Sequence, residues 1–388
     1  MSREKLSSAP ARERQRFFEE KRAKIVDTIR ELVSIESPSD NKPALDSLAE
    51  ILAGKFGELG GRPTLHKQQS AGNHLQVDFG ATDRAKPVML LGHYDTVYAM
   101  GTLASMPCRV ADGKVWGPGA LDMKGGIALM LEALAGLREL HGDVPRPVTV
   151  LLNSDEEVGS DSSRKLIESL AKKSAAVLVL EPAAGLHGAL KTARKGVGDY
   201  HLRVTGHAAH AGLDFSKGVS AILELAHQIT EIAKLSDLDR GTTVNVGVIR
   251  GGTRTNVIAA EASAEIDVRI ARLEDGPKID AKLRALRPLN HRCKMEISGG
   301  INRPPMERTD GVARLYAKAS ELAAELGWKA EEAAVGGGSD GNFTTAVGAA
   351  TLDGLGAVGE GAHATHESIV IEELPRRAAL ISLLIESV

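Results

Sequence analysis

Three nearly uninterrupted apolar runs, each followed at once by acidic residues or histidine, constrain the fold of this sequence most. They are PVMLLGHYD at 87–95, VTVLLNSDEE at 148–157 and AAVLVLEP at 175–182. Strands this apolar are expected to be covered by helices on both faces, as parallel strands usually are. A helical pattern at about 126–140 separates the first two runs, and we expect the strand–helix alternation to continue to the third. The sequence therefore predicts an α/β fold with a largely parallel sheet and helices on both faces.

Helical periodicity also marks the segments before this alternation. Residues 17–35 place Ile25, Ile29 and Leu32 on one face, which predicts an amphipathic helix. A second helix is expected over 45–59, where Gly60 and Gly61 supply a stop signal. A further strand is expected at 74–80.

A second, smaller domain is indicated from about residue 195. DYHLRVTG, TTVNVGVIRGG, ASAEIDVRIA and CKMEISGG predict four strands, with helices near 217–233 and 274–287. This content is that of a small α+β two-layer sandwich inserted into the larger domain. After it, a helix at about 310–326, the segment GGGSDGNF and a closing helix from Glu372 resume the α/β pattern. We therefore predict one domain from residues 1–195 and 306–388 and an inserted domain from 196–305.

Composition excludes several classes of function. A chain of 388 residues is long enough for two domains, and its net charge of −3 creates no field that attracts nucleic acid or an anionic membrane. Aromatic residues are only 3% of the chain, too few for a platform that stacks single-stranded nucleic acid. The N-terminal segment is charged throughout, and no apolar run is long enough to span a membrane. Two distant cysteines argue against a disulfide framework, so we expect a cytoplasmic protein.

Potential metal ligands follow every central strand. The runs end in His93 and Asp95, in Asp155–Glu157 and in Glu181, while Asp122 lies in GPGALDMKGG and GAHATHES supplies His363 and His366. In open α/β sheets, ligands bind at the carboxyl ends of strands. Two histidines and three carboxylates converging there would suit a pair of divalent ions such as Zn²⁺. The alternative for any single residue is that strand ends are polar because they meet solvent.

The spacing of these residues suggests a division of roles. Asp95 lies two positions beyond His93 on an extended chain, so it points to the same side and can accept the other imidazole N–H. Glu156 and Glu157 are neighbours and point opposite ways, so one can ligate metal while the other acts as general base.

At this point the sequence resembles a known family, the dinuclear-zinc exopeptidases and amidohydrolases. This family includes glutamate carboxypeptidase, acetylornithine deacetylase, succinyl-diaminopimelate desuccinylase and the aminoacylases, and the glutamate carboxypeptidase branch is the most similar. The matching segments run in the family's order from about residue 90 to 367: GHYDTV, GPGALDMKGG, NSDEEVGS, LEP, TGHAAHAG, RTNVIAA, DVRI, GGGSDG and GAHATHE.

The resemblance implies a role for each candidate residue of the larger domain. The implied metal ligands are His93, Asp122, Glu157, Glu181 and His363, with Asp122 bridging two ions. Glu156 would be the general base and Asp95 the partner that orients His93. His363 is preferred to His366 because the family places its ligand in a GxHxxxE-like setting, with Glu367 four residues on. A cis peptide is implied after Asp122.

In the inserted domain, the resemblance implies a lid that also forms a homodimer. His210 would hydrogen-bond the developing oxyanion, and Asn256 would contact the substrate. Arg303 would hold a substrate carboxylate, which Gly337 and Gly338 would let the backbone approach. Without the resemblance, His210 can equally be a surface histidine, Asn256 a turn cap and the triple glycine a tight turn. Lys191, Arg194 and Lys195 either select an acidic acyl group or lie on a solvated face.

We therefore expect a two-zinc hydrolase that cleaves an amide bond next to a free carboxylate, in an N-acyl amino acid or a short peptide. A biosynthetic deacylase acting on acetylornithine or succinyl-diaminopimelate is the alternative within this class. A non-catalytic binding protein is a rival from another class, but it would have no need of a general base. A serine nucleophile is not indicated by the sequence.

Overall fold

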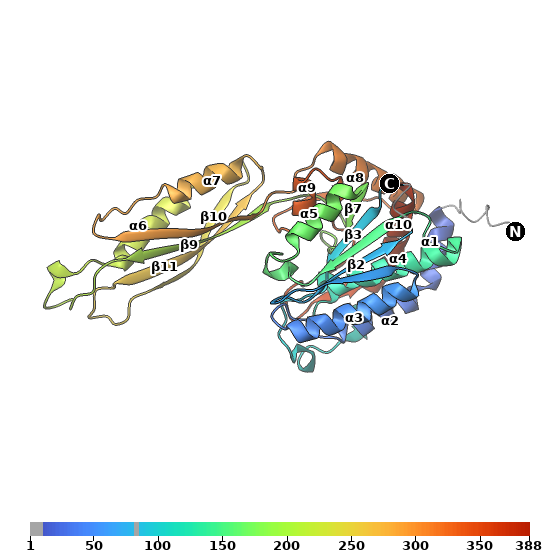
Figure 1. Cartoon of the computed structure of the whole chain (residues 1–388), viewed down its shortest axis with the longest axis horizontal. Coiled ribbons are helices and arrows are strands. Elements are labelled where there is room, and N and C mark those ends of the chain that lie inside the picture. The colour runs from blue at the N-terminus through green and yellow to red at the C-terminus, as the bar shows by residue number, and fades with distance from the viewer. Residues whose placement is uncertain (1–10, 81–84) are drawn as a thin grey trace. The chain divides into compact units, whose positions relative to one another are not determined.

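The computed structural model describes residues 11–80 and 85–388, and the chain divides into two compact units (Figure 1). The first ten residues, part of the charged N-terminal segment, lie outside the described ranges. Of the described residues, unit 1 contains those up to Ala193, together with Arg308–Val335 and Ser339–Val388, and unit 2 contains Arg194–Glu307 with Gly336–Gly338. These boundaries lie within two residues of those expected, except that Gly336–Gly338 belong to unit 2.

Unit 1 is built on a six-stranded mixed sheet in the order β1-β2-β6-β3-β7-β14. The strands are β1 (Arg62–His66), β2 (His74–Phe79), β3 (Val88–His93), β6 (Val148–Asn153), β7 (Ala176–Val179) and β14 (Thr351–Leu352). β6, β3, β7 and β14 are parallel, whereas β2 pairs antiparallel with both β1 and β6. The expected parallel core is therefore confirmed, with an antiparallel extension at one edge.

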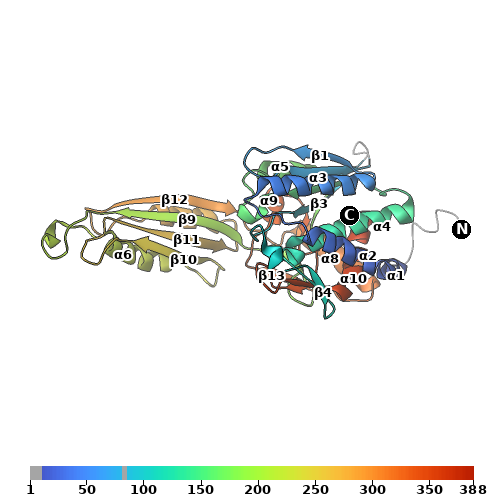
Figure 2. The same ribbon diagram turned by 90° about the horizontal axis from the view of Figure 1, so that it is seen from below.

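Helices cover both faces of this sheet, as the apolar runs predicted. On one face Leu90, Val150 and Leu178 pack into the large core with the helices α2, α3, α4, α8 and α10. On the other face Leu91, Leu151 and Val179 pack against the helices α5 and α9 (Figures 1 and 2). The helix bounds are α2 (Arg22–Val33), α3 (Lys42–Glu58), α4 (Gly125–His141), α5 (Arg164–Lys173), α8 (Asp310–Glu325), α9 (Gly341–Ala346) and α10 (Leu374–Ser387).

The order of the strands places a topological switch point at β3. From β3 the chain passes through α4 to β6, and then returns through α5 to β7 on the other side of β3. Because α4 and α5 cover opposite faces, the carboxyl ends of these strands border a crevice of the kind in which α/β proteins bind ligands. His93 is the last residue of β3, so it lies at this point.

The helix expected over 17–35 is instead two helices, α1 (Ala11–Glu20) and α2, which meet at Lys21. α1 packs against α10, where buried Arg14 donates from Nη1 to Ser382 Oγ at 3.0 Å. A second, four-stranded sheet of β4 (Arg109–Ala111), β5 (Lys114–Trp116), β15 (Gly359–Glu360) and β16 (Ser368–Val370) was not expected from the sequence. It pairs two segments far apart in the chain, which local periodicity cannot reveal.

Unit 2 is a four-stranded antiparallel sheet with two helices. Figure 2 shows its strands in the order β12, β9, β11, β10. Along β9 buried and exposed residues alternate, and Tyr200, Leu202 and Val204 pack into a core of their own. The predicted two-layer sandwich is thus observed. Its elements are β9 (Gly196–Thr205), α6 (Ala221–Ala233), β10 (Thr243–Gly251), β11 (Glu261–Ile270), α7 (Asp275–Arg284) and β12 (Lys294–Arg303).

Candidate functional site

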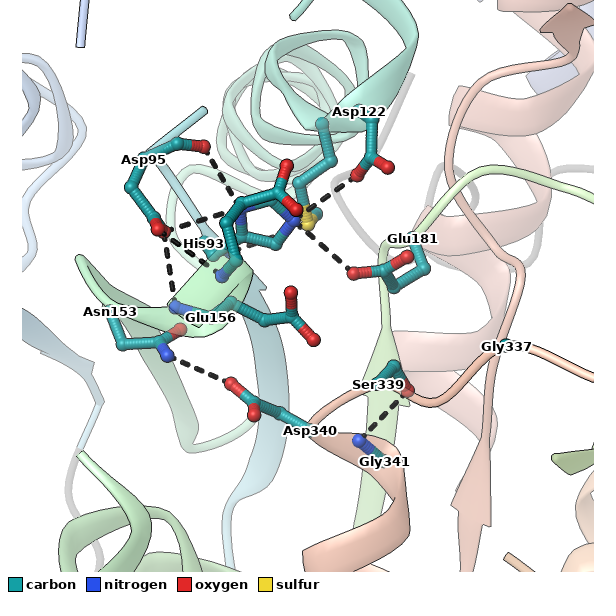
Figure 3. A network of polar contacts seen from close by, with 12 residues as sticks. His93, Asp95, Asp122, Asn153, Glu156, Glu181, Gly337, Ser339, Asp340 and Gly341 are labelled. Carbon is teal, nitrogen blue, oxygen red and sulfur yellow. Dashed lines mark hydrogen bonds and ion pairs between the residues drawn. The ribbon is translucent and has the colours of Figure 1, made fainter. Parts of the chain in front are cut away.

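His93 is buried at the end of β3 with its two ring nitrogens facing different partners. Nδ1 lies 3.1 Å from the backbone oxygen of Asp95 and 3.4 Å from Asp95 Oδ1. Nε2 lies 3.2 Å from Asp122 Oδ1 and 3.3 Å from Glu181 Oε1 (Figure 3). Because Asp95 takes the Nδ1 side, this arrangement directs Nε2 towards the two other carboxylates, as a metal-ligating histidine requires.

A second, similar group forms on the other oxygen of Asp122. His363 Nε2 lies 3.4 Å from Asp122 Oδ2 and 3.2 Å from Glu157 Oε2. The two oxygens of Asp122 therefore face two different imidazoles, each accompanied by one glutamate. The backbone of His363 is in the left-handed region, with φ of 63°. That conformation is uncommon for a non-glycine residue, and residues held in it tend to cluster at functional sites.

Asp95 also fixes the turn that carries the glutamate pair. The turn Glu156–Val158 begins three residues after the end of β6. The backbone N–H groups of Glu156 and Glu157 donate to Asp95 Oδ1 and Oδ2 at 3.3 and 3.2 Å. Ser39 Oγ donates to Asp95 Oδ2 at 2.7 Å. Asp95 therefore connects the end of β3 to the turn, a second role that its spacing from His93 did not reveal.

The two glutamates of the turn take different places in the cluster. Glu156 forms a group with His93 and Glu181, in which one potential ligand atom from each lies within 4.8 Å of the others. Glu157 forms a group of the same kind with His93 and Asp122. Both glutamates thus reach the cluster around His93, and the division of roles expected between them stays a prediction.

The electrostatics of the cluster favour positive charge at its centre. Hydrogen bonds to Asp122 and Glu157 raise the pKa of His363 to about 10. Burial opposes ionisation of Asp122, but the bonds from His363 and His93 outweigh it and lower its pKa. Burial raises the pKa of Glu157, and its Oε1 is buried without a hydrogen-bond partner among the described residues. An imidazole and carboxylate donor set with a buried, unsatisfied oxygen fits a divalent cation.

Glu367 is a residue of the site whose role the sequence did not reveal. It is fully buried and accepts hydrogen bonds from the backbone N–H groups of Gly119, Leu121 and Asp122 at 3.0, 2.7 and 2.9 Å. Tyr98 Oη also donates to it at 2.6 Å. One carboxylate thus holds the turn that presents Asp122, whose bond to Met123 is cis as expected. The available signal was its position four residues after His363.

The segment GGGSDG also has a structural role that the sequence did not reveal. Asp340 accepts from Asn153 Nδ2 at 2.8 Å (Figure 3). It also accepts from Ser160 Oγ at 2.5 Å. Since Asn153 ends β6 and Ser160 follows Glu157, Asp340 supports both sides of the glutamate turn. Asp155 accepts instead from the backbone N–H and the hydroxyl of Ser162, at 2.8 and 2.7 Å.

The remaining candidates belong to unit 2. His210 and Asn256 are exposed on adjacent segments, joined by a hydrogen bond from Ala211 N to Asn256 O at 3.0 Å. His210 Nδ1 accepts two backbone N–H groups, from Gly212 and Leu213, at 3.1 Å each. Nδ1 is therefore the acceptor of the neutral ring, and the tautomer assigned from these bonds carries its proton on Nε2.

Arg303 is buried in unit 2, and a Cβ on Gly338 would lie 3.0 Å from its Cδ, so glycine allows close packing there. Arg194 Nη1 donates to the carbonyl oxygens of Gly337 and Gly338 at 3.2 and 3.0 Å. Lys191 and Arg194 are both buried. The solvated face considered for these two residues is therefore wrong.

Comparison with known proteins agrees with this geometry. The profile of peptidase family M20/M25/M40 matches residues 89–387. Carboxypeptidase G2 of Pseudomonas sp. (strain RS-16) is 31% identical over 373 residues, which cover 93% of this chain and 88% of the relative. The chain belongs to peptidase family M20/M25/M40. The resemblance noted in the sequence is thereby confirmed.

Relatives within the M20/M25/M40 family carry different names. Succinyl-diaminopimelate desuccinylase of Stenotrophomonas maltophilia (strain K279a) is 29% identical, covering 78% of this chain and 84% of the relative. The solved structure of aminopeptidase PepT from Bacillus cereus ATCC 10987 superimposes with a TM-score of 0.78 at 25% identity, covering 94% of this chain and 98% of that one. The family and these relatives indicate a hydrolytic enzyme of the metallopeptidase and amidohydrolase type. Among residues 11–80 and 85–388, no helix is long and apolar enough to cross a membrane.

Proposed function

We propose that this protein hydrolyses the amide bond next to a free carboxylate, in N-acyl amino acids or at the C-terminus of short peptides, with two zinc ions. One observation supports it above the others: the two oxygens of Asp122 face His93 and His363 separately, at 3.2 and 3.4 Å. A bridging carboxylate between two imidazoles is an arrangement that serves a pair of metal ions.

The ligands of the proposed ions divide into two sets that share Asp122. His93 and Glu181 would hold one ion, and His363 and Glu157 the other. When bound, such ions supply Lewis-acid activation of water and of the amide carbonyl. Asp95 would keep the His93 tautomer in which Nε2 is free to ligate.

Glu156 is the proposed general base. It lies against His93 and Glu181 in the cluster, while its backbone N–H is fixed by Asp95. Glu156 would take a proton from the attacking water and then deliver it to the amine that leaves. His210, with its proton on Nε2, would donate a hydrogen bond to the oxyanion.

Recognition of the substrate is proposed for unit 2 residues. Arg303 would hold the free carboxylate of the substrate, because a guanidinium binds a carboxylate with two parallel hydrogen bonds. Gly337 and Gly338 would let backbone amides approach it, and Asn256 would contact the substrate. The relative named carboxypeptidase G2 supports this substrate class.

The variant Glu156→Gln tests the mechanism. We expect hydrolysis to fall by a factor on the order of 10²–10⁴, the usual contribution of a general base, while two ions remain bound. The measurement combines elemental analysis with amide hydrolysis. Near-normal turnover in this variant would contradict the role of Glu156.

A biosynthetic deacylase is the second candidate function, supported by the relatives named succinyl-diaminopimelate desuccinylase and acetylornithine deacetylase. A panel of N-acyl amino acids, varied first at the amino acid and then at the acyl group, separates the two. Preference for acetylornithine or succinyl-diaminopimelate over all C-terminal peptide substrates would favour the deacylase.

We also propose that unit 2 forms a homodimer. β10 is an edge strand of its sheet, with exposed Ile249, and α6 carries exposed Leu223. Exposed apolar side chains beside an unpaired strand edge favour association. Light scattering of the wild type and of Ile249→Lys tests this. The cytoplasmic location stays a prediction that cell fractionation can check.

A further inference from the structure

Arg377 is a fully buried cation whose three nitrogen positions all bind backbone. It lies on α10, and Nε donates to Gly356 O at 2.9 Å and Nη1 to Gly188 O at 3.1 Å. Nη2 donates to Gly354 O. Three separate carbonyl groups from two segments of chain therefore converge on one guanidinium.

Burying this charge is costly. Burial lowers the pKa of Arg377 to about 9, so the side chain is still a cation at neutral pH. An apolar residue would fill the same space without the cost of removing a charge from water. The positions of the bound carbonyl groups indicate why a guanidinium is present here.

The first bound segment, Gly354–Gly356, lies along the end of β7. Leu355 N donates to Val179 O at 3.1 Å, and Gly356 N donates to Glu181 O at 2.9 Å. A Cβ on Gly356 would lie 2.1 Å from Leu180 O, so only glycine permits this approach. Arg377 thus holds in place the segment that fixes the backbone of Glu181.

The second bound segment follows Glu181 in the chain. Gly188 closes the turn that begins after Pro182, in which Ala184 N and Ala189 O are joined at 2.9 Å. Arg377 therefore binds both the segment that pairs with the backbone of Glu181 and the turn that follows Glu181 in the chain. The carboxylate of Glu181 lies 3.3 Å from His93 Nε2, a distance that a shift of about 1 Å in the backbone would spoil.

We propose that Arg377 is a positioning residue for Glu181, and through it for one of the two metal ions. This inference rests on the proposed two-metal centre. A lysine has one charged nitrogen and cannot bind three divergent carbonyl groups, so its charge alone would not replace the guanidinium.

The test is a cobalt(II) titration of the full-length protein, first stripped of metal, followed by visible absorption and calorimetry. The variants are Arg377→Lys and Arg377→Met, with Arg376→Lys as the matched control. Arg376 is the neighbour on the same helix, stacks on Trp328 and pairs with Glu373. Glu181→Ala and Glu157→Ala identify the spectrum that remains when either ion's ligand set is broken.

For Arg377→Lys we expect the affinity for one cobalt ion to fall about 10- to 100-fold, the usual effect of a residue that supports a ligand. Its spectrum should match that of Glu181→Ala, and the second ion should bind as in the wild type. Arg376→Lys should bind both ions normally. Since Lys keeps the charge and one carbonyl bond, this variant serves if Arg377→Met does not fold.

An equal loss of affinity for both ions in Arg377→Lys would overturn the proposal, and so would normal binding of two ions by the folded variant. Either result would leave Arg377 a role in fold stability alone. If the wild type itself binds fewer than two ions, the two-metal centre is wrong, and the proposal falls with it. The wild-type titration therefore separates the two failures.

Discussion

Replacing Glu367 with glutamine perturbs the turn that presents Asp122 while conserving shape. The carboxylate accepts three backbone N–H groups and the hydroxyl of Tyr98. In glutamine one oxygen becomes an NH₂ group. If the remaining oxygen keeps Leu121 N and Asp122 N, the NH₂ group faces Gly119 N–H, donor against donor.

The magnitude follows from these contacts. A lost hydrogen bond to a charged group contributes about 1.5–3 kcal/mol, and a buried donor left unsatisfied costs about 1–3 kcal/mol. Burial raises the pKa of Glu367, so a neutral side chain recovers part of the cost of burying the charge. We expect a net loss of about 2–4 kcal/mol in the free energy of unfolding.

Urea unfolding of metal-free protein measures this loss, and calorimetric metal titration shows whether Asp122 still binds. The control is Glu360→Gln, which changes an exposed carboxylate on β15 that pairs with Lys114, and it should leave both measurements unchanged. Wild-type stability and wild-type metal affinity in Glu367→Gln would refute the reasoning. Lost stability with full metal affinity would show that the turn holds Asp122 without this carboxylate.

Three further predictions concern metal, packing and pH. Removing metal with a chelator should abolish hydrolysis and lower the midpoint of thermal unfolding, which falls because the clustered carboxylates then repel one another. Adding zinc back should restore both. An unchanged midpoint in verified metal-free protein contradicts this prediction. Gly126→Ala should destabilise the protein, since the new Cβ would lie 2.1 Å from Leu180 O. The control Gly54→Ala in α3 places its Cβ where no atom lies within 4 Å, and it should raise the free energy of chemical unfolding by about 0.4–1 kcal/mol. Equal effects of the two variants would refute the packing argument. Burial opposes ionisation of Glu224, but hydrogen bonds led by Asn290 N–H lower its pKa below 4.5. The contribution of the Glu224 carboxylate to the free energy of unfolding is thus present above that value and lost as the pH falls through the lower folded pKa. The stability difference between wild type and Glu224→Gln should therefore shrink in acid. A constant difference from pH 7 to 3 would contradict this.

Local sequence was enough to predict the strands that carry the candidate site. The runs ending at His93, Asn153 and Glu181 are nearly continuously apolar because both of their faces are buried, and that property is visible residue by residue. The expected parallel pairing followed from the helix between the first two runs. The candidates for the metal ligands followed from the position of polar residues at strand ends.

Contacts between distant segments could not be predicted this way. Glu367 holds a turn about 245 residues earlier in the chain, and no local pattern relates the two. The packing of α1 against α10 joins the two ends of the described chain, and periodicity does not show such a contact. The burial of Lys191 and Arg194 likewise reflects neighbours from other segments, so a charged sequence was consistent with a solvated face.

The sequence by itself determined which residues can supply the chemistry: imidazoles and carboxylates that follow strands buried on both faces. Only the tertiary structure decided that β3 lies between β6 and β7, which brings their ends to one place. It also decided that the two oxygens of Asp122 face different histidines. The physical reason is the sequence separation of the contacts involved. The burial pattern of a strand can be seen in its own residues, whereas ligand distances depend on pairings and hydrogen bonds between segments that are remote in the chain.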